Sequence, residues 1–297
     1  MFWSATAPWT TADIPPQHGR TVVVTGATSG LGLETSRALV HAGARVLLAV
    51  RDTDRGAAVA AELGGAATAH RLDLADLTSV REFAAGVDGP IDVLINNAGL
   101  MAVPKGRTAD GFETQLGVNF LGHFALTGLL LDRITDRVVT LSSVAHRMGR
   151  IRLDDLNRES GRYERWSAYG QSKLACLMFA YELQHRFVAA GSTLRSMAAH
   201  PGYAATNLQS RTESFQDAVM SVLNRVVAQS GEAGALPSLY AATVPDLPGG
   251  SYIGPDGIGE ARGNPRPVGS TAASHDRRMQ QALWERAEEL TRVAFPL

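Results

Sequence analysis

Cysteine is nearly missing from this sequence of 297 residues, which contains only Cys176. A single cysteine cannot form an internal disulfide, and it excludes zinc sites built from several cysteines, so we expect a cytoplasmic protein. No eighteen apolar residues follow one another, and the N-terminus lacks the basic and apolar regions of a signal peptide. We therefore expect neither secretion nor a membrane span.

An excess of charge of either sign is also lacking. Lys and Arg together number 28 and Asp and Glu 29, which gives a net charge of -1. Because no overall field would attract nucleic acid or an anionic membrane, the expected partner is a small molecule. His-Glu-x-x-His and other clustered metal-ligand patterns are missing too, so the sequence predicts no metal site.

What the sequence does contain is a regular alternation of apolar β-branched runs and amphipathic segments, in a chain with 45% apolar residues. The expected strands are 21–25, 45–50, 68–72, 91–95, 137–141, 194–199 and 251–253. The expected helices are 31–42, 55–63, 77–87, 111–131, 167–190 and, after a Gly- and Pro-rich loop at 254–267, a last helix at 274–293.

Most of these strands are apolar throughout, which is typical of a parallel sheet covered by helices on both faces. The pattern predicts an α/β protein with one doubly wound, Rossmann-type domain at 20–297, a seven-stranded and mainly parallel sheet, and an N-terminal arm at 1–19. Two stretches interrupt the alternation, 145–166 and 209–230, and we expect both to border the substrate site. Within the second, apolar residues at helical spacing are equally consistent with a lid and with a core helix.

A glycine-rich turn follows the first expected strand. Glycines let the backbone approach a pyrophosphate closely, and the free amides at the start of the next helix stabilise its charge. A nucleoside-triphosphate loop would end in Gly-Lys-Ser/Thr, whereas here Leu33 and Glu34 follow Gly32. The predicted cofactor contacts in this turn are Gly26, Thr28, Ser29, Gly30, Leu31 and Gly32.

The end of the second expected strand bears on the choice of cofactor. Enzymes that select NAD usually place an acid there for the ribose 2′-hydroxyl, but this chain has Arg51. A guanidinium pairs with the 2′-phosphate of NADP, which a carboxylate would repel. The sequence therefore favours NADP over NAD, with two alternatives left open: a solvated Arg51, or Asp52 as the ribose acid.

Tyr169 and Lys173 lie four residues apart in an expected helix. This spacing places both side chains on one helix face, so the Lys173 ammonium can lie beside the Tyr169 phenol. A nearby positive charge favours the phenolate, so Tyr169 is a candidate general acid/base. Ser143, at the end of an earlier strand, could supply a neutral hydrogen-bond donor to a reacting carbonyl oxygen.

These motifs together resemble the short-chain dehydrogenase/reductase family, and within it the retinol-dehydrogenase and WW-domain-oxidoreductase group. The resemblance spans about 21–293 and rests on the following motifs: Thr25-Gly-x-x-x-Gly-x-Gly32, Asp73-Leu74, Asn96-Asn97-Ala98-Gly99, Asn119, Ser143, Tyr169-x-x-x-Lys173 and Pro201-Gly202. It implies further cofactor contacts at Asp73, Leu74, Asn97, Ala98, Gly99, Tyr169, Lys173, Pro201, Gly202 and Thr206.

The resemblance also implies roles in the reaction. Ser143, rather than Ser142, corresponds to the catalytic serine, and Asn119 resembles the asparagine that positions a water behind Lys173 as a proton relay. Lys173 is expected to bond the nicotinamide ribose as well. Related enzymes often form dimers or tetramers on the helix that carries Tyr169 and Lys173, so the sequence leaves a homo-oligomer open.

The predicted function is NAD(P)-dependent hydride transfer between the nicotinamide and a carbonyl or alcohol substrate of apolar character. The main alternative is a catalytically weak NADP-binding module on the same fold, since a fold does not fix a function. A light-dependent reductase of the protochlorophyllide type shares the motifs but has no further support. His123 and His200 have no carboxylate at a telling spacing, so we expect structural roles for both.

Overall fold

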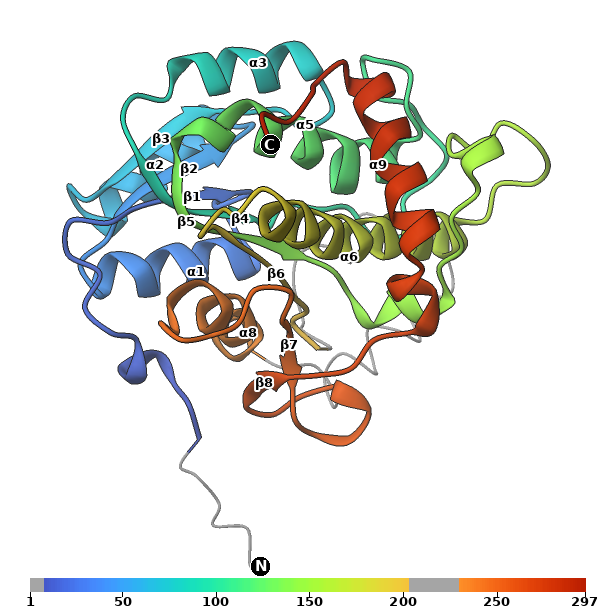
Figure 1. The fold of residues 1–297 in the computed structure, drawn as a ribbon. Helices are drawn as coiled ribbons and strands as arrows, with labels where there is room; N and C mark the ends of the chain where they lie inside the picture. The colour runs from blue at the N-terminus through green and yellow to red at the C-terminus, as the bar shows by residue number, and fades with distance from the viewer. Residues whose placement is uncertain (1–7, 203–229) are drawn as a thin grey trace, which may run out of the picture.

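The computed structural model describes residues 8–202 and 230–297, which form one α/β sheet covered by helices (Figure 1). The sheet has eight strands in the order β3-β2-β1-β4-β5-β6-β7-β8, and all neighbouring pairs are parallel except β7 and β8. The strands are β1 (Thr21–Thr25), β2 (Arg45–Val50), β3 (Ala67–Arg71), β4 (Ile91–Asn96), β5 (Ile134–Leu141), β6 (Arg195–Ala199), β7 (Tyr252–Pro255) and β8 (Pro265–Pro267).

Strand order reverses beside β1, which pairs with β2 on one side and with β4 on the other. The chain builds outward from β1 to β3, then returns to start β4 and builds in the other direction. In open parallel sheets a ligand crevice forms at such a reversal, outside the carboxyl ends of the strands. The turn after β1 and the loop after β4 meet at this point.

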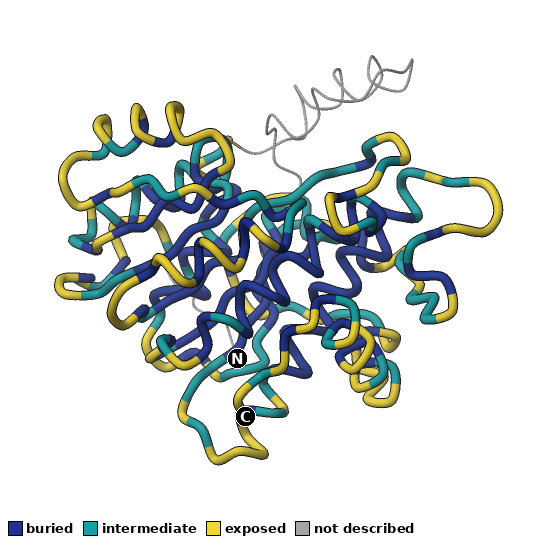
Figure 2. Tube along the Cα trace, turned by 90° about the horizontal axis from the view of Figure 1, so that it is seen from above, coloured by how far each residue is buried: buried dark blue, intermediate teal, exposed yellow. Residues whose placement is uncertain are grey.

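Helices form a layer on each face of the sheet. The helices are α1 (Gly30–His41), α2 (Thr53–Leu63), α3 (Leu77–Gly86), α4 (Thr114–Leu116), α5 (Gly122–Leu130), α6 (Arg165–Ala189), α8 (Gly231–Thr243) and α9 (Arg277–Thr291). One apolar core packs under α3, α5, α6 and α9, and a second under α1, α2 and α8. Figure 2 shows the buried strands between layers of helices whose outer surfaces are exposed. This doubly wound arrangement confirms the predicted fold class.

The prediction of seven strands was wrong by one, because β8 lies within the expected loop at 254–267. β8 has only three residues and pairs antiparallel with β7, from Ile253 opposite Pro267 to Pro255 opposite Pro265. Proline cannot donate a ladder hydrogen bond, so it is tolerated at a sheet edge but carries no strand signal in a sequence. Helix α8 was also not predicted, because Pro237 lies inside it and its small residues form no apolar stripe.

The expected helix at 111–131 is interrupted in the structure. A π-helical turn, Gly117–Leu121, separates α4 from α5, and Asn119 lies in this turn. Such turns insert one extra residue and often occur at functional sites. Nearly all of α5 is buried, so this segment has no one-sided apolar stripe in which the insertion would appear as a shift. Among the described residues, the helical run Thr114–Arg133 is long and apolar enough to cross a membrane. However, 83% of its most apolar 18-residue stretch is buried inside the fold.

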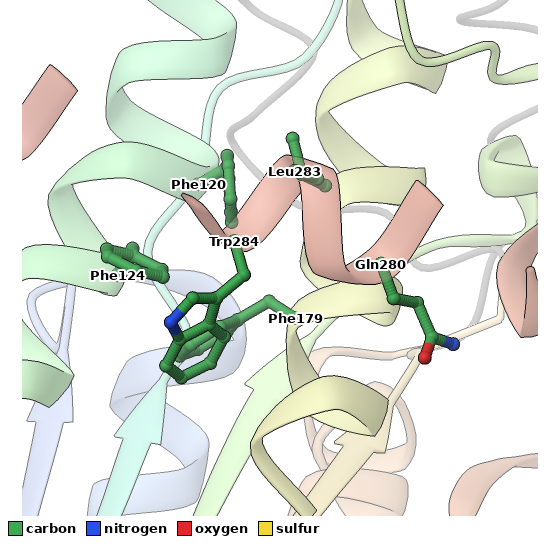
Figure 3. Close-up of a pocket in the computed structure, with 6 residues that line it drawn as sticks. All are labelled: Phe120, Phe124, Phe179, Gln280, Leu283 and Trp284. Atoms are coloured by element: carbon green, nitrogen blue, oxygen red, sulfur yellow. The ribbon is translucent and has the colours of Figure 1, made fainter. Parts of the chain in front are cut away.

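Helix α9 covers the outer faces of α5 and α6 (Figure 1). Its Trp284 packs against Phe124 at 5.0 Å and stacks on Phe179 at 5.8 Å between ring centroids. The small hollow drawn in Figure 3, lined by Phe120, Phe124, Phe179, Gln280, Leu283 and Trp284, has no room for a water-sized sphere. The hollow is therefore a packed aromatic core, and the chain itself covers this face of the helix that carries Tyr169.

Candidate functional site

The turn between β1 and α1 needs glycine at three positions for distinct reasons. Gly26 and Gly30 have φ angles of 69° and 53°, in the left-handed region that side chains disfavour. A Cβ on Gly32 would lie 2.4 Å from the carbonyl oxygen of Gly26. The spacing seen in the sequence thus reflects a tight turn that brings its own backbone against the start of α1.

The first turn of α1 differs from that of its neighbours. Ser29 precedes α1 without accepting a hydrogen bond through its side chain, whereas carboxylates cap α2, α3 and α6, namely those of Asp52, Asp76 and Glu164. The amides at the start of α1 therefore have no side-chain cap and, with the helix dipole, favour an anion. This arrangement fits the pyrophosphate of a dinucleotide.

The loop after β4 is locked to the end of β1. The Thr25 hydroxyl accepts hydrogen bonds from the amides of Asn97 and Ala98, both at 2.9 Å, and the Asn97 Nδ2 donates to the Thr25 carbonyl at 2.8 Å. The Asn97 Oδ1 is buried without a protein partner. A buried amide oxygen of this kind is suited to accept a hydrogen bond from a bound ligand. Gly99 completes this loop.

Three further predicted contacts lie at the ends of β2 and β3, on the same edge of the sheet. Arg51 is exposed directly after β2. Asp52, the alternative ribose acid, instead begins α2, since its Oδ1 accepts from the Arg55 amide at 3.0 Å. After β3, the Asp73 Oδ1 accepts from the Ala75 amide at 3.0 Å, and Leu74 is buried. These residues therefore lie at the carboxyl ends of β2 and β3, and their contact with a cofactor stays a prediction.

Tyr169 and Lys173 lie on α6, with relative exposures of only 5% each. The Lys173 ammonium lies 5.9 Å from the centre of the Tyr169 ring and donates a hydrogen bond to the Leu141 carbonyl at 3.0 Å. It also lies close to Gly99, where an added Cβ would approach Nζ to 3.4 Å. Lys173 thus connects α6 with the ends of both β5 and β4.

The two serines after β5 have different environments. Ser142 is buried, and its hydroxyl donates to the Lys173 carbonyl at 2.7 Å. Ser143 is partly exposed and accepts only the Ala145 amide, at 3.2 Å, which leaves its hydroxyl hydrogen for a ligand. The following turn packs tightly on α6 beside Tyr169, because a Cβ on Gly149 would lie 2.3 Å from the Gly170 carbonyl.

Asn119 has a full set of side-chain partners. Its Oδ1 accepts from the Leu100 amide at 2.7 Å, and its Nδ2 donates to the Leu100 carbonyl at 2.9 Å and to the Ser172 hydroxyl at 2.8 Å. Asn119 therefore ties the π-helical turn to the loop after β4 and to α6. The proton relay that the resemblance implies for Asn119 stays a prediction.

Pro201 and Gly202 follow β6, and the Gly202 amide donates to the His200 Nδ1 at 3.2 Å. Thr206 and nearly all of 209–230 lie outside the described residues. The predicted contact at Thr206, and the two alternatives of a lid or a core helix within 209–230, stay predictions. In the part of the chain that the structure describes, no group of three or more His, Cys, Asp or Glu side chains could hold a metal ion.

Glu260, between β7 and β8, is a contact that the sequence reasoning missed. Its Oε1 accepts from the Arg147 guanidinium at 2.7 Å, and its Oε2 lies 3.0 Å from the His200 Nε2. Burial lowers the pKa of His200 to about 3, and neither the His200 Nε2 nor the Glu260 Oε2 has hydrogen-bond geometry with a protein partner. Glu260 thus links the turn after Ser143 to the segment before Pro201.

Comparison with known proteins shows the family of this chain. Residues 20–217 match the family model for short chain dehydrogenases. The chain belongs to the short-chain dehydrogenase family. It is 38% identical to human (Homo sapiens) retinol dehydrogenase 13, over 96% of this chain and 87% of that protein. It is also 38% identical to polyprenol dehydrogenase of Mus musculus, over 94% and 85%.

Among solved structures, an uncharacterised protein from Mycobacterium Paratuberculosis is 52% identical, with a TM-score of 0.86, over 98% of this chain and 100% of that chain. Family membership and the similar dehydrogenases make this chain an NAD(P)-dependent oxidoreductase with a Rossmann-type fold, as the motifs predicted. The binding-module alternative is not favoured.

Proposed function

We propose that this short-chain dehydrogenase transfers a hydride between NADP(H) and the carbonyl or alcohol carbon of an apolar substrate. The observation that carries the proposal is the contact of Lys173 with the end of β5: its ammonium lies over the Tyr169 ring and donates to the Leu141 carbonyl, two residues before Ser143. A Ser-Tyr-Lys set suits carbonyl reduction, because the serine can polarise the carbonyl, the tyrosine can supply a proton and the lysine charge favours the phenolate.

Each side chain meets one need of the reaction. The nicotinamide supplies or accepts the hydride when it is bound. During reduction, negative charge grows on the substrate oxygen, where the Ser143 hydroxyl donates a hydrogen bond and the Tyr169 hydroxyl donates its proton. The Lys173 ammonium favours the phenolate left on Tyr169. In alcohol oxidation Tyr169 accepts the proton instead, so the same residues serve either direction.

The preference for NADP rests on Arg51. It is exposed at the end of β2, where a 2′-phosphate would lie, and Asp52 is engaged in capping α2. An arginine without a competing acid favours the additional phosphate. NADP is therefore the proposed cofactor, with NAD as the alternative.

The apolar character of the substrate has two supports. Trp166 packs edge-on against Tyr169, with 6.1 Å between ring centroids, and Met148, in the turn after Ser143, is 59% exposed. The similar proteins named above are dehydrogenases of retinol and polyprenol, both apolar alcohols. We also propose a cytoplasmic location and a homo-oligomer.

The decisive test is turnover by the Tyr169→Phe variant, followed through the nicotinamide absorbance with NADPH and a panel of long-chain aldehydes and ketones. We expect turnover to fall at least a thousandfold, because no proton donor remains, while the dissociation constant for NADPH changes less than threefold. Tyr181→Phe is the matched control, since its hydroxyl bonds Ser270 away from the site on the same helix. Turnover by Tyr169→Phe at the wild-type rate would contradict the proposed role.

A further inference from the structure

His123 connects two separate parts of the candidate site. It lies at the start of α5, is 1% exposed, and places its Nδ1 3.0 Å from the Asn119 carbonyl and its Nε2 2.9 Å from the Thr25 hydroxyl. A carbonyl oxygen can only accept, so Nδ1 carries the hydrogen. The Nε2 lone pair must then accept the hydrogen of the Thr25 hydroxyl.

The Thr25 hydroxyl is fixed by this contact. Its oxygen already accepts from the amides of Asn97 and Ala98, and its other acceptor, the Ile95 carbonyl, is farther away at 3.4 Å. The ring of His123 therefore sets the direction of the hydroxyl hydrogen and leaves the oxygen lone pairs facing the two amides. A continuous series of hydrogen bonds runs from the loop after β4, through Thr25 and His123, to Asn119.

The neutral form of His123 is required for this series. Burial lowers the pKa of His123 to about 4, the Asn119 carbonyl opposes this effect, and the nearby Lys173 charge adds to it. A protonated ring would present a donor to Thr25 at Nε2 and would remove the acceptor for the hydroxyl hydrogen. The next residue, Phe124, is also buried and packs in the aromatic core. An apolar ring is therefore accommodated at the neighbouring position of α5, and burial alone does not explain the histidine at 123.

We propose that His123 is a positioning residue with two separable functions: through Thr25 it orders the loop that binds the cofactor, and through the Asn119 carbonyl it orders the π-helical turn beside Lys173. The inference rests on the proposed function for its effect on turnover. It assigns cofactor affinity to the Thr25 contact and the catalytic rate to the Asn119 contact.

The state of the ring can be measured without activity. Long-range ¹H–¹⁵N spectra of the ¹⁵N-labelled full-length protein should show one histidine with Nδ1 protonated and Nε2 unprotonated, unchanged from pH 8 to pH 5.5, and the signal should vanish in His123→Phe. An Nε2-protonated ring, or a ring that titrates within this range, would overturn the inference.

Two half-variants separate the contacts. In His123→Asn, the amide nitrogen can replace Nδ1 and keep the bond to Asn119 but cannot reach Thr25. We expect the NADPH dissociation constant to rise about tenfold, with kcat within threefold of wild type. In His123→Gln, the terminal amide can reach Thr25 but loses the Asn119 contact, so we expect kcat to fall about tenfold with little change in NADPH affinity.

Phe124→Leu is the control for simple loss of stability, since Phe124 is the next residue of α5 and lies outside the site. If both His123 variants lose thermal stability like Phe124→Leu but keep wild-type kcat and NADPH affinity, His123 has only a packing role and the inference is wrong. A wild type that binds NADPH but reduces no carbonyl compound would contradict the proposed function alone. The ring spectra and the NADPH affinity of His123→Asn would then still decide the role of His123.

Discussion

The two sides of the candidate site are held by different kinds of contact. The glycine-turn side, 25–32 with 97–99, is held mainly by backbone groups and by close approaches at glycines, such as that of Gly32 to the Gly26 carbonyl. The Ser143 side, 143–149 with 200–202 and 257–263, depends on side chains that meet across the fold, such as Arg147 with Glu260. Backbone geometry leaves a local signature in a sequence, whereas contacts between distant side chains leave none.

The largest expected effect is a loss of folding stability at low pH. It arises from a buried histidine on each side: His123, which contacts Thr25 of the glycine-turn side, and His200 of the Ser143 side. Burial lowers the pKa of His123 to about 4 and that of His200 to about 3, whereas both titrate near 6.5 in the unfolded chain. Below pH 6.5 the unfolded state binds more protons, so stability is present above this pH and is lost as the pH falls toward the folded-state values. By pH 5 each histidine should cost about 2 kcal/mol of unfolding free energy.

Urea denaturation at pH 7.5 and pH 5 measures this loss. Carboxylates whose folded-state pKa lies below 4, such as that of Asp136 beside Arg195, contribute little in this interval. A urea midpoint that does not move between the two pH values would show that the histidines are protonated, or accessible, in the folded protein.

On the glycine-turn side, Gly32→Ala should weaken NADPH binding about a hundredfold. A Cβ would lie 2.4 Å from the Gly26 carbonyl, and relieving such overlap costs about 1–3 kcal/mol and displaces the amides that face the pyrophosphate. Calorimetric titration with NADPH checks this expectation. Gly86→Ala on α3 is the control, because a Cβ there meets open space. Equal affinity in both variants would show that the turn does not approach the cofactor.

The sequence predicted the tight glycine turn between β1 and α1 because its determinants are local. Three glycines within seven positions specify the turn, and the spacing of Tyr169 and Lys173 specifies one face of α6. The Ser143 side could be located only in part, since Arg147 and Glu260 are 113 positions apart. The π-helical turn at Asn119 was not predicted because its segment is buried on nearly all sides and has no apolar stripe that an inserted residue would displace. Strand β8 was not predicted because proline carries no strand signal.

A smaller effect is expected at the outer end of the glycine-turn side. Arg51→Ala should weaken NADPH binding about tenfold and leave NADH binding unchanged, because a charge-assisted hydrogen bond to the 2′-phosphate is worth about 1.5–3 kcal/mol and exposure reduces it. Fluorescence titration of both cofactors measures the change in preference. Arg55→Ala changes another exposed arginine, on α2, and is the control. An unchanged ratio of the two affinities would remove Arg51 from the choice of cofactor.

The smallest effect should come from the side-chain link on the Ser143 side. Glu260→Gln removes the charge that pairs with Arg147, and because the Arg147 side chain is 44% exposed, the pair is worth about 1 kcal/mol or less. We expect kcat to fall no more than about fivefold with unchanged NADPH affinity, since Glu260 reaches the turn after Ser143 and not the glycine turn. Glu289→Gln on α9 removes a comparable exposed pair far from the site. A loss of NADPH affinity in Glu260→Gln would show that the two sides are coupled through His200 and Gly202, and that side-chain contacts also order the cofactor crevice.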